Sequence, residues 1–147
     1  MQNITYLSNI LLDTTVFVYT QYIIPWINQC RRYKSKYVIS DFYPLCRVGN
    51  LPAVKELYTL YQGELNLNLA LGEAVNGNQV NVSRFLIESG ANNLDDCLKV
   101  ACANNHYELV ELFIQKGASI LIGKRMTRST NILRMIYRYE QKSELIN

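Results

Sequence analysis

The sequence contains little of what catalytic and metal sites are built from. Among its 147 residues there is one histidine, His106, and four cysteines, namely Cys30, Cys46, Cys97 and Cys102. The cysteines show neither a two-residue spacing nor a pairing with histidine, and zinc sites and redox motifs need such spacings. A glycine-rich phosphate loop is also missing. We therefore expect a protein that is not an enzyme, with no catalytic residue, no metal and no cofactor.

A strong charge of either sign is missing as well. The net charge of +3 is too small to indicate nucleic acid as the partner. Hydrophobic residues make up 49% of the chain, which excludes intrinsic disorder as its main state. The length suits one domain. We expect a single domain over residues 1–147, with reduced cysteines and a cytoplasmic location.

What the sequence does contain is an internal repeat. Residues 69–92 and 96–119 share one pattern at an offset of 27 residues, the distance from Gly90 to Gly117. A weaker third copy lies upstream, around residues 45–58. No single copy can bury its apolar face alone, so the copies are expected to stack on one another. The aligned pairs include Leu71 with Leu98, Ala74 with Ala101, Asn78 with Asn105, and Val82 with Leu109.

Each copy divides into two short helices. In the later copy we expect the first helix over residues 96–104, with Asp95 or Asp96 as its N-cap. The second helix is expected over residues 107–116 and should end at Gly117 in a left-handed conformation. The apolar residues fall on one face of each helix: Leu98, Ala101 and Cys102 in the first, and Leu109, Val110, Phe113 and Ile114 in the second.

The residues from Leu98 to Ser119, LKVACANNHYELVELFIQKGAS, closely resemble the ankyrin repeat. The segment GNLPAVKEL at residues 49–57 resembles the common first-repeat variant of that family. The resemblance covers residues 40–120 and implies an all-α fold, a short ankyrin-like solenoid of stacked helix hairpins with helical caps at both ends. His106 falls at the histidine of the family's Gly-His turn, where a structural hydrogen bond is expected.

The spacing departs from that family. An ankyrin unit has about 33 residues, so a spacing of 27 omits about six. We assign the missing residues to the β-hairpin finger, because the link before the last copy is too short for a hairpin. Helix pairs joined by tight links are the prediction.

The resemblance also implies where a partner binds. Ankyrin stacks are non-enzymatic protein–protein interaction modules that present the solvent side of their first helices, and the links before them, as a concave surface. Each transferred residue could equally be an ordinary surface residue, since few interface residues carry binding energy. The candidates on the first helices are Arg47, Glu73, Asn76, Lys99 and Asn104, and those in the links are Asn92, Asn93 and Asp95.

A narrower resemblance concerns origin. Short repeats without fingers, in a chain rich in Asn, Tyr and Ile, resemble those of the multigene families of large DNA viruses. This resemblance implies a viral protein that modulates host innate immune signalling in the cytoplasm of the host cell.

The two ends are expected to cap the stack, because repeat arrays need terminal units with a polar outer face. We predict N-terminal capping helices in residues 1–37, about three repeats in residues 38–120, and a C-terminal capping helix in residues 121–147. In the C-terminal helix, from about residue 129 to 141, the residues predicted to face inward are Ile132, Leu133, Ile136 and Tyr137, and Arg128, Arg134 and Arg138 should face water.

The N-terminal segment leaves a different class of function open. The chain is mostly apolar from Ile10 to Ile27, and four basic residues follow in residues 31–36, as on the cytoplasmic side of a membrane span. Its most apolar part is shorter than the roughly 20 residues that a spanning helix needs. We favour a buried capping helix. The alternative function is a membrane-associated protein anchored by this segment.

The sequence also bears on two other kinds of partner, a second copy of the chain and a polyanion. A short stack has exposed ends, so a homodimer stays open as an alternative. Basic clusters at residues 31–36 and 124–128 could bind nucleic acid or anionic lipid. We expect solvated faces instead, and hence no nucleic-acid partner.

Overall fold

The computed structural model describes residues 21, 25 and 37–144, and the chain divides into two compact units, Met1–Val38 and Ile39–Asn147. The predicted N-terminal capping helices and the segment from Ile10 to Ile27 lie outside the described residues, apart from Gln21, Pro25 and Tyr37. Among the residues described, no helix combines the length and the apolar character that crossing a membrane requires.

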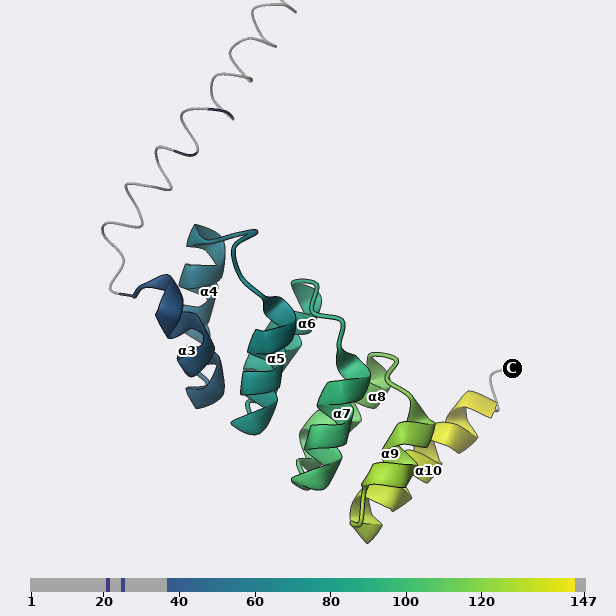
Figure 1. Ribbon diagram of the computed structural model, residues 1–147. Helices are drawn as coiled ribbons and strands as arrows, with labels where there is room; N and C mark the ends of the chain where they lie inside the picture. Colours follow the sequence, from purple (N-terminus) through teal and green to yellow (C-terminus); the bar gives the residue numbers. More distant parts are fainter. Residues whose placement is uncertain (1–20, 22–24, 26–36, 145–147) are drawn as a thin grey trace, which may run out of the picture. The chain divides into compact units, whose positions relative to one another are not determined.

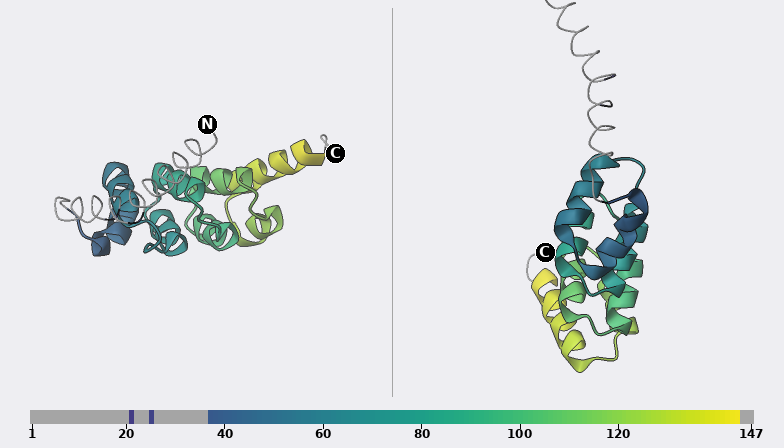
Figure 2. Two further views of the ribbon diagram at one scale, coloured as in Figure 1. Left: turned by 90° about the horizontal axis from the view of Figure 1, so that it is seen from above. Right: turned by 90° about the vertical axis from the view of Figure 1, so that its left-hand side faces the viewer.

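The second unit is built from helices, with no strand between residues 39 and 144. Its first helices lie side by side in one layer and its second helices in another, so that consecutive helices form hairpins (Figures 1 and 2). The predicted all-α stack of helix hairpins is confirmed. The elements are η2 (Ile39–Asp41), α3 (Phe42–Val48), α4 (Leu51–Leu60), α5 (Leu67–Asn76), α6 (Val80–Glu88), α7 (Leu94–Ala103), α8 (Tyr107–Gln115), α9 (Ile120–Met126) and α10 (Thr130–Glu144).

The core follows the repeat register. The aligned pairs Leu71 and Leu98, and Ala74 and Ala101, are fully buried in α5 and α7. The small side chains of Ala74 and Ala101 let the first helices approach one another closely. Between the second helices the buried residues are larger and include Leu57, Val82, Leu86, Leu109, Leu112 and Phe113.

A residue with a positive φ follows each of the helices α3 to α8 and turns the chain, and four of these residues belong to the repeat copies predicted from residues 69–119. Gly90 has a φ of 113° and Gly117 a φ of 97°, while Asn78 and Asn105 have φ values of 55° and 58°. After Gly117 the Ala118 N–H donates to the carbonyl of Phe113 at 2.9 Å, which is the long bond of a Schellman motif. The left-handed Gly117 was predicted, and asparagine tolerates the same conformation.

The start of α7 differs from the prediction. The residue preceding the helix is Asn93, and its side chain makes no capping hydrogen bond. Asp95 and Asp96 lie in the first turn of α7 instead of at the N-cap. Their charges still suit that end of the helix, because the helix dipole favours carboxylates there.

The C-terminal region contains two described helices, α9 and α10, where we expected one capping helix. Ile132 and Ile136 are buried as predicted, but Tyr137 is 50% exposed, and Met135 takes the inward position. Met135 lies three residues after Ile132, so it shares the buried face of α10. The Lys124 ammonium in α9 pairs with Glu140 in α10 at 2.6 Å, which joins the two helices of this last hairpin.

Candidate functional site

The predicted binding residues lie on one layer of the second unit. We call the solvent side of α3, α5 and α7, together with the links before α5 and α7, the first-helix face. Of the candidates on it, Arg47, Asn76, Asn92, Asp95 and Asn104 are exposed, and Glu73, Asn93 and Lys99 are half-buried.

Two candidates on neighbouring helices pair with each other. The guanidinium of Arg47 on α3 lies 3.7 Å from the carboxylate of Glu73 on α5. Exposed ion pairs of this kind contribute at most about 1 kcal/mol to stability. The pair therefore leaves both charges available to a partner on the surface of the stack.

Lys99 has a partner on its own helix. Its ammonium donates to Asp96 at 2.7 Å, three residues earlier on α7. The hydrogen bond to Asp96 and the charge of that carboxylate raise the pKa of Lys99. Lys99 is thus a positive charge on the α7 part of the first-helix face.

The link candidates hold neighbouring repeats together. The Asn68 side chain on α5 accepts from the Asn92 backbone N–H at 2.9 Å and donates to the Asn92 side chain at 2.9 Å. The Asn93 side chain donates to the Asn68 carbonyl at 3.1 Å. These contacts join the first turn of α5 to the link that follows α6.

Asp95 makes the equivalent contact one repeat later. Its carboxylate accepts from the Ser119 backbone N–H at 2.7 Å. Both contacts span 24 residues, and Asp95 occupies the position of Asn68 in the repeat register. The Tyr43 hydroxyl accepts from the Asn66 N–H at 3.3 Å in the same way. A side chain near the start of α3, α5 and α7 therefore holds the link that precedes the next first helix.

Replacing Asp95 with alanine should lower the free energy of unfolding by about 0.5–1.5 kcal/mol, since the Ser119 N–H loses its acceptor. Asp95→Asn is the matched control, because an asparagine at Asn68 already accepts the equivalent bond. Urea denaturation of both variants measures the effect. Equal losses in the two variants would show that the negative charge, and not the hydrogen bond, stabilises the link.

Asn76 and Asn104 differ from the other candidates. Asn76 is the last residue of α5, and Asn104 directly follows α7. Both are exposed, and neither side chain forms a hydrogen bond within the described part of the chain. Their amides are thus free to bind a partner.

The three cysteines in the described part of the chain are buried. Burial raises the pKa of Cys102 to about 11 and, with nearby Asp96, that of Cys97 to about 11. Burial and then the charge of Glu73 raise the pKa of Cys46 to about 12. These thiols are protonated at neutral pH, and only a thiolate is a strong nucleophile.

The structural hydrogen bond expected of the His106 side chain is not made at Nδ1. That nitrogen is buried and has no hydrogen-bond partner. The backbone of His106 forms hydrogen bonds instead. Its N–H donates to the Ala101 carbonyl at 2.9 Å, and its carbonyl accepts from the Val110 N–H at 3.0 Å. These bonds join the end of α7 to the start of α8.

Paired helices that stack through a repeated register define a helical repeat protein. Residues 93–125, which contain α7, α8 and most of α9, match the family model for the ankyrin repeat. This segment is an ankyrin repeat, and the resemblance is confirmed there. Searches of curated proteins and of solved structures gave no match. Ankyrin repeats are typically interaction modules that bind other proteins.

Sequence reasoning missed the internal roles of the link residues. Asn68, which bonds to both Asn92 and Asn93, was not singled out at all. The repeat register could have indicated the role of Asn68. Asn68 and Asp95 are separated by the repeat spacing of 27 residues, and both side chains can accept a hydrogen bond.

Proposed function

We propose that the chain is a non-enzymatic interaction module that binds a protein partner through its first-helix face. The observation that carries the proposal is the combination, on one face of an ankyrin-type stack, of charged side chains with the unbonded amides of Asn76 and Asn104. Such a face can bind a partner without breaking the contacts that hold the stack together.

The candidate residues fall into two groups, those that hold the links of the stack and those whose side chains are available to a partner. Asn92, Asn93 and Asp95 hold the links, so their replacement would disturb the stack as well as the surface. Arg47, Glu73, Asn76, Lys99 and Asn104 are the candidates whose side chains are available for direct contact with the partner.

For the biological setting, we propose a viral modulator of host innate immune signalling that acts in the host cell cytoplasm. The support is the pattern of short repeats in a chain rich in Asn, Tyr and Ile, together with tight links in place of β-hairpin fingers. The links between α6 and α7 and between α8 and α9 contain no strand.

Affinity purification with mass spectrometry tests the proposal. The first-helix variant carries Arg47→Glu with Glu73→Lys, which exchanges the charges of an ion pair and keeps its attraction. It also carries Asn76→Arg and Asn104→Arg. We expect a protein captured from host cytoplasmic lysate by the wild type to be lost from this variant.

A matched control changes the second-helix layer by the same net charge. It carries Lys116→Glu with Glu88→Lys, which exchanges an ion pair at 4.0 Å, together with Asn81→Arg and Gln141→Arg at exposed positions. Circular dichroism first shows that both variants fold. Loss of the partner from the control alone, or its retention by both variants, would place the binding surface elsewhere.

A further inference from the structure

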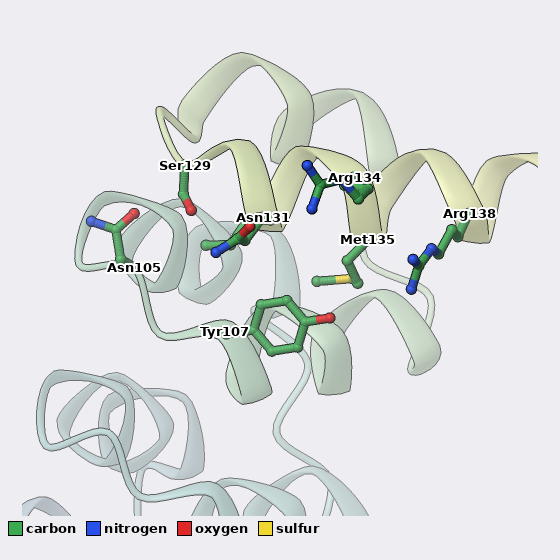
Figure 3. A pocket seen from close by; sticks show the side chains of 8 residues that line it. Asn105, Tyr107, Ser129, Asn131, Arg134, Met135 and Arg138 are labelled. Atoms are coloured by element: carbon green, nitrogen blue, oxygen red, sulfur yellow. The ribbon is translucent and has the colours of Figure 1, made fainter.

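A polar cavity lies away from the first-helix face. It has a volume of about 450 Å³ and lies between the α7–α8 turn, the start of α8 and the side of α10. Figure 3 shows the Tyr107 ring next to Met135, with Arg138 extending from α10 on the side of the Tyr107 hydroxyl. The lining residues are Asn105, Tyr107, Ser129, Asn131, Ile132, Arg134, Met135 and Arg138.

The cavity is lined by hydrogen-bond donors and cations. Arg134 and Arg138 supply guanidinium groups, and Tyr107 and Ser129 supply hydroxyls. No carboxylate lines it. Met135 and Ile132 are only 3% and 1% exposed, so they form a rigid apolar base beneath the polar rim.

The two arginines are neighbours without a counter-charge. They lie four residues apart on α10, where like charges repel and destabilise the helix slightly. Both are exposed, and neither forms an ion pair with any described residue. An anion placed between them would relieve this repulsion and accept charge-assisted hydrogen bonds.

Two acidic side chains of the adjoining helices are engaged elsewhere, and the exposed Glu108 on α8 does not line the cavity. Glu111 on α8 accepts from the Tyr139 hydroxyl at 2.9 Å, and Glu140 on α10 pairs with Lys124. The hydrogen bond from Gln115 lowers the pKa of Tyr139, but partial burial and the bond to Glu111 outweigh it, so the pKa is raised. Tyr139 therefore remains a donor that holds Glu111.

We propose that this cavity binds an acidic segment of a protein, with Arg134 and Arg138 as its carboxylate-binding residues and the Tyr107 hydroxyl as a further donor. This second surface shares no residue with the first-helix face. The protein could therefore bind two partners, or two segments of one partner, at the same time.

Residues 121–147, which contain both arginines, carry six basic and two acidic residues. This positive charge does not continue along the stack, which favours a short acidic peptide over a nucleic acid. Residues 40–120 carry five basic and nine acidic residues, so a long polyanion leaving the cavity along the stack would meet net negative charge. Nucleic-acid binding needs several phosphate contacts in a row. A short acidic segment needs only two of its carboxylates to pair with the two arginines.

Fluorescence anisotropy with a fluorescein-labelled hexaglutamate peptide tests this proposal on the full chain at low ionic strength. The cavity variant carries Arg134→Gln and Arg138→Gln. The matched control carries Arg84→Gln and Arg125→Gln, which remove the same charge from exposed positions on α6 and α9. We expect the Kd of the cavity variant to rise about tenfold or more, since charge-assisted bonds are lost.

The control variant should stay within about twofold of the wild type, because neither Arg84 nor Arg125 lines the cavity and neither supplies a charge-assisted hydrogen bond there. The first-helix variant without its Asn104→Arg change, which would add a cation beside the cavity residue Asn105, should also keep hexaglutamate binding, and this separates the test from that of the proposed function. Lack of saturable binding by the wild type, or an equal loss in the cavity and control variants, would overturn the proposal. Tighter binding of oligothymidylate than of hexaglutamate through the same arginines would also overturn it, in favour of nucleic acid.

Discussion

Replacement of Phe113 by alanine is expected to lower the free energy of unfolding by about 3–5 kcal/mol. The Phe113 side chain is 0% exposed and is among the largest fully buried side chains of the described residues. It lies in α8, which packs against α6 on one side and α10 on the other. The truncated side chain would leave a cavity in the middle of the second-helix layer. Urea denaturation followed by circular dichroism measures the loss.

Two further variants test whether the loss of stability comes from the buried face of α8. Leu109→Ala, four residues earlier on the same buried face, should cost about 2–5 kcal/mol. Glu108→Ala changes an exposed side chain of the same helix and should stay within about 0.5 kcal/mol. Unchanged stability of both Phe113→Ala and Leu109→Ala would show that the assigned repeat register is wrong.

The second large effect is expected at Gly77, directly after α5. A Cβ atom added there would lie 1.8 Å from the Arg47 carbonyl oxygen and 2.8 Å from the Arg47 carbonyl carbon. These are backbone atoms, which cannot swing away as a side chain would. Gly77→Ala should therefore force α3 away from α5 and lower the free energy of unfolding by about 3 kcal/mol or more.

Gly72 provides a matched control on the same helix. A Cβ atom at Gly72 meets no other atom within 4 Å, so alanine fits there without strain. Because alanine favours helix more than glycine does, Gly72→Ala should raise stability by about 0.5–1 kcal/mol. The close approach of α3 and α5 would be refuted if both alanine variants stabilised the protein.

The helices of the repeat could be predicted because their apolar residues recur at helical spacing. The second helix of the later copy was predicted over residues 107–116 and observed as Tyr107–Gln115. The first was predicted from residue 96 and observed from Leu94. The error at that end has a physical cause, since carboxylates in a first turn and at an N-cap are both favourable.

Contacts between repeats were harder to predict. The close approach of Gly77 to the Arg47 carbonyl depends on how α3 packs against α5. The spacing of apolar residues within one helix gives no information about this packing. The positive φ values of Asn78 and Asn105 were also not predicted. Their alignment at the repeat spacing was visible in the sequence, but their role in turning the chain follows only from the backbone.

The sequence predicted where the candidate binding residues lie better than it predicted what their side chains do. The transferred residues do lie on the first helices and their links, yet Asn92, Asn93 and Asp95 use their side chains within the stack. The cavity beside α10 could not be predicted, because it combines the α7–α8 turn with residues more than 20 positions later in the chain. Only tertiary packing brings Tyr107 next to Met135.

Site-specific photocrosslinking tests the central claim of a protein-binding first-helix face most directly. A photoreactive amino acid is placed at Asn76 on α5 or, in a matched protein, at Arg84 on α6, both exposed positions. After irradiation in a cell lysate, we predict a defined adduct with one protein from position 76 and none from position 84. The same adduct from position 84 alone, or no adduct from position 76, would contradict the claim.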